Sequence, residues 1–120
     1  MSDTIVFVSS DAERSAAMAS PMSAEGWAVA TVEPDRSDAL ESIEACTPVA
    51  TVFDLDSGPE LALHELAKAM LGDPDLPRPL LVFVGGDAAI AESIKSDIPF
   101  GVFVGADELT WVLKHLVYKD

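Results

Sequence analysis

The stretch of sequence that decides the fold is Pro48-Val49-Ala50-Thr51-Val52-Phe53-Asp54-Leu55-Asp56-Ser57-Gly58. Its first part is continuously apolar and rich in β-branched and aromatic residues, which is typical of a strand buried on both faces of a sheet. The apolar run stops at Asp54, and a turn follows one residue later. The sequence therefore predicts a buried strand with a carboxylate at its carboxyl end.

Four other runs have the same composition as residues 49–53. They cover residues 5–8, 27–32, 80–84 and 101–104. Each is too short to span a membrane, which needs about 20 apolar residues in a helix. We predict that all five runs are strands, each buried on both faces.

Helical patterns separate these runs. We expect helices from Asp11 to about Ser20, from Ser37-Asp38 to about Cys46, from Pro59 to Leu71, from Ala88 to Lys95, and from Ala106-Asp107 onward. Pro21 should end or kink the first helix, because proline lacks the N–H that the helix needs. The third helix offers Leu61, Leu63, Leu66, Ala67 and Met70 for burial, and the last offers Leu109, Val112, Leu113 and Leu116.

This order is a strand followed by a helix, five times over. Such alternation predicts an α/β fold with a parallel sheet, helices on both faces and right-handed crossovers. A length of 120 residues fits one domain covering residues 1–120.

The chain is strongly acidic, with 21 Asp and Glu against 7 Lys and Arg and a net charge of −14. That charge repels nucleic acid and anionic membranes, so neither is expected as a partner. The single cysteine, Cys46, cannot form an intramolecular disulfide and is expected to be a small buried apolar residue. Together with the lack of a targeting signal, this favours the cytoplasm.

Five strand–helix units, with an aspartate closing the third strand, resemble the receiver domains of response regulators in bacterial two-component signalling. The resemblance covers the whole chain. It implies a doubly wound, flavodoxin-like fold with strand order 2-1-3-4-5. It also implies that Asp54 stands at the position that phosphorelays phosphorylate.

The other positions of that family site are changed. Receivers have two acids after the first strand, where this chain has Ser9 and Ser10, with Asp11 one place later as a helix cap. They have Thr or Ser at the end of the fourth strand, where Val84 stands. They have Lys at the end of the fifth strand, where the match is Val102 or a neighbour up to Gly105.

These changes bear on the chemistry of the pocket. Phosphoryl transfer depends on positioning and charge neutralisation, and Mg²⁺ prefers carboxylate oxygens. Asp54 remains as an anionic ligand, and the backbone carbonyl of Asp56 could add an oxygen without charge. We therefore expect weak Mg²⁺ binding, poor or no phosphotransfer, no cofactor, no metal and no enzymatic activity.

The last helix predicts an interaction surface. With its leucines inward, Trp111, His115 and Tyr118 share another face at spacings of four and three residues. Tryptophan and tyrosine are favoured at protein interfaces. We expect this face to bind a protein partner or a second copy of the chain.

Three hypotheses follow from the sequence. The first is a stand-alone pseudo-receiver that acts by protein contact without phosphorylation. The second is a phosphoacceptor that uses Asp54 in an altered site. The third is a small-molecule binder whose crevice, at the carboxyl ends of the strands, is lined by Ser9, Ser10, Asp54, Gly85 and Gly86.

Overall fold

The computed structural model describes residues 4–34, 37–46, 48–56, 60–72, 80–99, 101–105 and 107–117. The strands are β1 (Thr4–Val8), β2 (Ala28–Val32), β3 (Ala50–Asp54), β4 (Leu81–Val84) and β5 (Val102–Val104). The helices are α1 (Ala12–Ala24), α2 (Ala39–Cys46), α3 (Glu60–Leu71), α4 (Ala88–Asp97) and α5 (Leu109–Val117).

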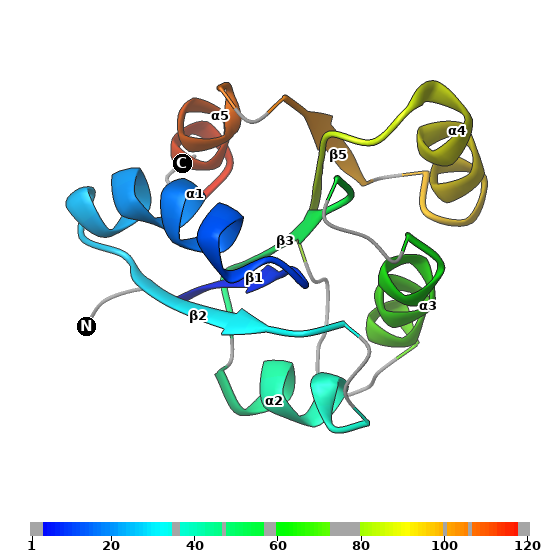
Figure 1. Cartoon of the computed structure of the whole chain (residues 1–120), viewed down its shortest axis with the longest axis horizontal. Helices are drawn as coiled ribbons and strands as arrows, with labels where there is room; N and C mark the ends of the chain where they lie inside the picture. Colours follow the sequence, from blue (N-terminus) through cyan, green and yellow to red (C-terminus); the bar gives the residue numbers. More distant parts are fainter. Residues whose placement is uncertain are drawn as a thin grey trace.

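The strands form one parallel sheet in the order β2-β1-β3-β4-β5 (Figure 1). Every strand pairs in parallel with its neighbours. The predicted fold class and strand order are therefore confirmed. The five expected strands differ from the observed ones by at most one residue at either end.

Side chains alternate between two cores because successive residues of a strand point to opposite faces. One face packs against α1 and α5, and its core includes Phe7, Val52, Met22 and Leu113. The other face packs against α2, α3 and α4, and its core includes Phe53, Phe83, Ile43, Leu63 and Ile94. Figure 1 shows α1 and α5 together on one side of the sheet and α2 and α3 on the other.

The two outer strands are less buried than predicted. Ala28 and Thr31 of β2 are exposed, and all three residues of β5 are half-buried. The central strands β3 and β4 are buried throughout. The prediction of strands buried on both faces was wrong for the outer pair, because an edge strand has a neighbour on only one side.

Helix α1 passes through Pro21 and ends at Ala24, so the expected end near Ser20 was wrong. Proline removes one hydrogen bond, but the last turn is held by other contacts. Met22 and Trp27 are buried in the core, and the backbone N–H groups of Glu25 and Trp27 donate to the Met22 carbonyl. Tertiary packing therefore outweighs the lost bond.

Several side chains lie elsewhere than expected. Leu61 is 71% exposed, although its helix buries Leu63, Leu66, Ala67 and Met70 as predicted. Cys46 and Val112 are half-buried, while Leu109 and Leu113 are fully buried. The side chain of Leu116 lies outside the described residues. None of the helices within the described ranges is long and apolar enough to cross a membrane.

Candidate functional site

Asp54 is the last residue of β3 and lies level with Val84 of β4. Its side chain points to the same face as that of Val52, two residues earlier, and therefore toward α1 and α5. The residue is 0% exposed. A buried carboxylate is costly unless charged or polar groups satisfy it, so its contacts decide what the site can do.

Arg14 of α1 supplies the counter-charge for Asp54. Its Nε lies 2.8 Å from Asp54 Oδ2, and its Nη2 lies 3.0 Å from Asp54 Oδ1. The two parallel N–H donors match the two carboxylate oxygens in the bidentate geometry that gives strong arginine–carboxylate pairs. Each oxygen of the aspartate thus accepts one guanidinium hydrogen bond.

The start of α1 places Arg14 in this position. Asp11 is the N-cap, and its Oδ1 accepts hydrogen bonds from the backbone N–H groups of Glu13 and Arg14 at 3.0 and 3.2 Å. The hydrogen bond to Asp54 is the largest cause that raises the pKa of Arg14 above its ordinary value. Burial, the next largest, lowers that pKa, and the charges of Asp54, Asp56 and Asp11 raise it further. The guanidinium is therefore a permanent cation.

Two further donors lie beside the Asp54 carboxylate. The Ser9 hydroxyl lies 3.3 Å from Asp54 Oδ2 and 3.2 Å from the Asp11 carbonyl, and its single proton serves one of them at a time. The backbone N–H of Asp56 donates to Asp54 Oδ1 at 3.2 Å. Each carboxylate oxygen therefore has a second donor within reach besides Arg14, and at Oδ2 that donor is shared with the Asp11 carbonyl.

The Asp56 carboxylate links this cluster to the loop after β4. Its Oδ2 lies 3.5 Å from Arg14 Nη2, and its Oδ1 accepts a hydrogen bond from the backbone N–H of Gly86 at 2.9 Å. Gly85 and Gly86 have φ angles of 75° and 78°, and a Cβ at position 85 would collide with Asp56 Oδ2. The glycine pair thus lets the carboxylate approach the backbone.

Valines occupy the level of Asp54 on β4 and on β5 beyond it. Val84 is fully buried and paired with Asp54, and the register then places Val104 beside Val84. The level position on β5 is therefore Val104, and Val102 lies two residues earlier beside Val82. Val84 and Val104 carry no hydroxyl or ammonium group that could contact a phosphoryl oxygen.

The cluster does not fit a divalent cation. Mg²⁺ requires about six oxygen ligands around one point, with carboxylates supplying the charge. In this site the two Asp54 oxygens already accept from a guanidinium. Within the described ranges, no group of three or more His, Cys, Asp and Glu side chains is arranged to hold a metal ion.

Sequence reasoning missed Arg14. A basic residue in the first turn of a helix is unfavourable beside the positive end of the helix dipole, so Arg14 needed a nearby anion. That mismatch was the available signal. The carboxylate that pairs with Arg14 is determined by how α1 packs on the sheet. A single sequence does not reveal that packing.

Part of the lining predicted for a small-molecule crevice is brought together in the structure. Ser9 and Asp54 contact each other, while Gly86 contacts Asp56. Elsewhere, a hollow of about 190 Å³ lies between α3 and α4, lined by Leu61, His64, Ile90, Ser93 and Ile94. His64 Nε2 there lies 2.8 Å from Asp97 Oδ2.

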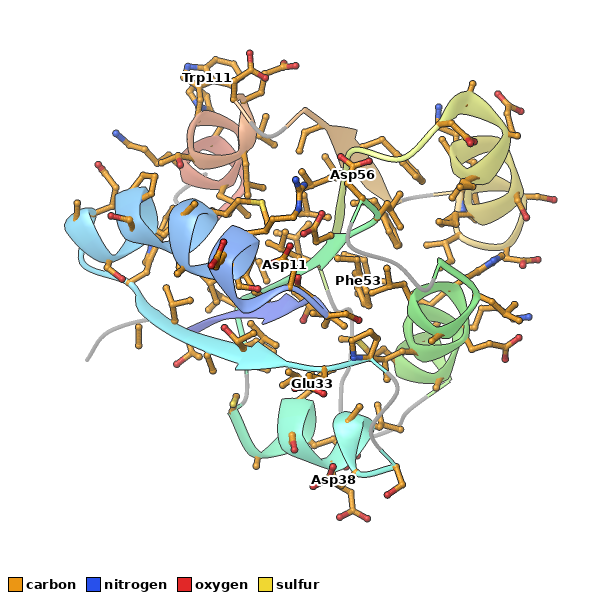
Figure 2. All side chains as sticks on the ribbon, in the orientation of Figure 1. Asp11, Glu33, Asp38, Phe53, Asp56 and Trp111 are labelled. Atoms are coloured by element: carbon orange, nitrogen blue, oxygen red, sulfur yellow. The ribbon has the colours of Figure 1, made fainter. Side chains whose placement is uncertain are left out.

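The predicted interaction surface on α5 exposes a large aromatic side chain. Trp111 is 64% exposed and points away from the sheet (Figure 2). The ring of His115 lies over it, with centroids 4.0 Å apart and planes tilted by 33°, and His115 Nδ1 is 2.9 Å from the Trp111 carbonyl oxygen. Tyr118 lies outside the described residues.

Comparison with solved structures identifies this architecture. No family model and no curated protein matches the sequence. A response-regulator signal receiver domain from Bermanella marisrubri has a TM-score of 0.78 and 20% identity, over 98% of this chain and 99% of its own. The Vibrio cholerae chemotaxis protein CheY4 has a TM-score of 0.77 and 11% identity, over 95% of this chain and 98% of its own.

A third similar structure is the receiver domain of a Pseudomonas aeruginosa sensor histidine kinase. It has a TM-score of 0.71 and 13% identity over 98% of each chain, and a magnesium ion is coordinated in its active-site cleft. The chain therefore has the fold of response-regulator receiver domains.

Proposed function

We propose that this chain is a receiver-type signalling domain that acts through protein contacts and does not depend on phosphorylation of Asp54. The observation that carries the proposal is the bidentate pairing of Arg14 with a fully buried Asp54. A nucleophilic carboxylate has to present an oxygen to the phosphoryl donor. Here both oxygens accept hydrogen bonds from Arg14 and from a second donor.

The neighbouring positions support the same proposal. In the similar histidine-kinase receiver a magnesium ion is coordinated in the cleft, whereas Arg14 provides the positive charge beside Asp54 in this chain. Val84 and Val104 lie level with Asp54 and offer no polar group to a phosphoryl oxygen. We infer a pseudo-receiver of bacterial type, without enzymatic activity and working in the cytoplasm.

The output surface in this proposal is the α5 face formed by Trp111 and His115, which Tyr118 extends in the sequence. An exposed tryptophan is the kind of side chain that anchors protein interfaces. Because the net charge is −14, we expect the partner surface to be neutral or basic. A second copy of the chain, which carries the same charge, is the less favourable partner.

Phosphorylation of the purified chain tests the proposal. We expect acetyl phosphate with Mg²⁺ to leave the intact mass unchanged, and beryllofluoride with Mg²⁺ to leave the amide NMR signals of residues 54 to 56 in place. Both results follow because the guanidinium occupies the oxygens that the phosphoryl group would need.

Asp54→Asn is the matched control, since it removes the nucleophile and keeps the shape of the side chain. A mass increase of one phosphoryl group that is absent from Asp54→Asn would contradict the proposal. It would instead establish the second hypothesis, a phosphoacceptor with an altered site.

A further inference from the structure

Removal of Arg14 would leave an unusual concentration of negative charge. Asp54 is completely buried, and Arg14 Nη2, which donates to Asp54 Oδ1 at 3.0 Å, also lies 3.5 Å from Asp56 Oδ2. The Ser9 hydroxyl faces Asp54 as well. Without the arginine, the two carboxylates would face the place where the guanidinium now lies, and the Ser9 hydroxyl would remain beside Asp54 Oδ2.

That set of oxygen atoms is of the kind that hard divalent cations prefer. The guanidinium and a divalent cation cannot share the place, because both need the same carboxylate oxygens and both are positive. The side chain of Arg14 is 38% exposed, so this place is open to solvent on one side. Access would therefore not prevent a cation from reaching it.

Asp56 is held in position independently of Arg14. Its Oδ1 accepts the Gly86 N–H at 2.9 Å, and its own backbone N–H donates to Asp54 Oδ1 at 3.2 Å. The two carboxylates are thus tied to each other and to the loop after β4. Loss of the arginine would not by itself release them.

We propose that Arg14 is a tethered counter-cation, which neutralises Asp54 and Asp56 from within the chain and thereby closes a latent divalent-cation site. The inference rests on the ion pair that also carries the proposed function. It extends that function by assigning the exclusion of metal to a single side chain. Arg14→Met tests it, because methionine keeps much of the aliphatic stem and removes the charge.

Each protein is titrated with MnCl₂ while paramagnetic broadening of the amide signals of residues 9, 54 and 56 is monitored. In a second titration, with MgCl₂, the melting temperature is monitored. The wild type should show no selective broadening at these residues. Arg14→Met should show it and bind Mn²⁺ at least about tenfold more tightly, with a melting temperature that rises with MgCl₂. The double variant Arg14→Met/Asp54→Asn should lose this gain in Mn²⁺ affinity.

Two controls separate this effect from the general attraction of an acidic chain for cations. Lys95→Met removes one positive charge from α4, where Lys95 lies over the Phe103 ring at 5.2 Å from its centroid. It should leave Mn²⁺ binding at the wild-type level. Arg14→Lys keeps a positive charge at position 14 and should continue to exclude the metal.

Selective broadening at residues 9, 54 and 56 in the wild type would overturn the inference. So would a gain in Arg14→Met no larger than in Lys95→Met. If Arg14→Met is unfolded without metal, MgCl₂ should restore its folded spectrum, and failure to do so would also count against the latent site. Phosphorylation of the wild type would defeat the proposed function but leave the Mn²⁺ comparison of the variants intact.

Discussion

The environment of Asp54 depends on a residue without a side chain as well as on Arg14, Ser9 and Asp56. Gly85 contributes no side chain, yet its bare Cα leaves the space that the Asp56 carboxylate fills. Asp56 in turn contacts Arg14 and the Gly86 backbone. The charge balance around the buried aspartate therefore depends on a glycine that makes no polar side-chain contact.

Substitution of Gly85 tests this dependence. Gly85→Ala would place a methyl group against Asp56 Oδ2 and would also hold alanine at a φ of 75°. We expect the free energy of unfolding to fall by about 2–4 kcal/mol, since backbone strain and a displaced carboxylate add. Urea denaturation followed by circular dichroism measures the change.

Gly26→Ala is the matched control for that experiment. Its φ of 96° imposes similar backbone strain, but a Cβ there would meet nothing within 4 Å. The loss should be only about 1–2 kcal/mol. Equal losses at the two positions would show that the contact with Asp56 adds nothing.

At the scale of elements, the strands were easier to predict than the helices and the site. Continuous apolar runs such as residues 49–53 are distinctive, because few other structures bury such a run on both sides. The helix end predicted from Pro21 was wrong because Met22 and Trp27 hold the last turn of α1 through tertiary packing. Such contacts join segments distant in sequence, and local patterns carry no record of them.

Contacts between distant segments also limit how much of the site could be predicted from the sequence. Asp54 was placed at the end of its strand by local pattern, as the structure has it. Its pairing with Arg14 spans 40 residues and depends on the rotation of α1 against the sheet. The sequence left the level position on β5 open between Val102 and Gly105, and the register selects Val104, because strand register is also a tertiary property.

The exposed tryptophan on α5 can be tested by substitution. Because Trp111 is 64% exposed, Trp111→Ala should change the free energy of unfolding by less than about 0.5 kcal/mol. Self-association, or binding to a partner once one is known, should weaken at least about tenfold, as expected for an interface anchor. Sedimentation equilibrium reports self-association, and calorimetry reports partner affinity.

Leu61→Ala serves as the control, because Leu61 is 71% exposed on α3, whereas Trp111 lies on α5. It should leave self-association and partner binding unchanged. If Trp111→Ala behaves like Leu61→Ala in both measurements, the α5 face is not the interaction surface.

At the scale of the whole molecule, like charges repel in the folded chain. The net charge is −14, and salt screens such repulsion with a Debye length of about 10 Å at 0.1 M ionic strength. We expect the melting temperature to rise by several degrees between about 0.02 and about 0.5 M NaCl. Differential scanning calorimetry at constant pH measures this.

Glu33→Gln provides the comparison at this scale. Glu33 is exposed just after β2, so its removal lowers the net negative charge without disturbing the core (Figure 2). The variant should melt higher than the wild type in low salt and equal to it in high salt. A wild-type melting temperature that falls as NaCl is added would mean that attractive ion pairs outweigh the net repulsion.

The close approach of Gly85 to Asp56 also constrains how the sequence can evolve. Any side chain at position 85 displaces the carboxylate that lies against Arg14, so the three positions can be exchanged only in concert. Homologues that keep the arginine should keep the glycine and the second acid, while Gly26 drifts independently of them. We therefore expect arginine at 14, aspartate at 56 and glycine at 85 to occur together in other chains of this fold that carry their own counter-ion.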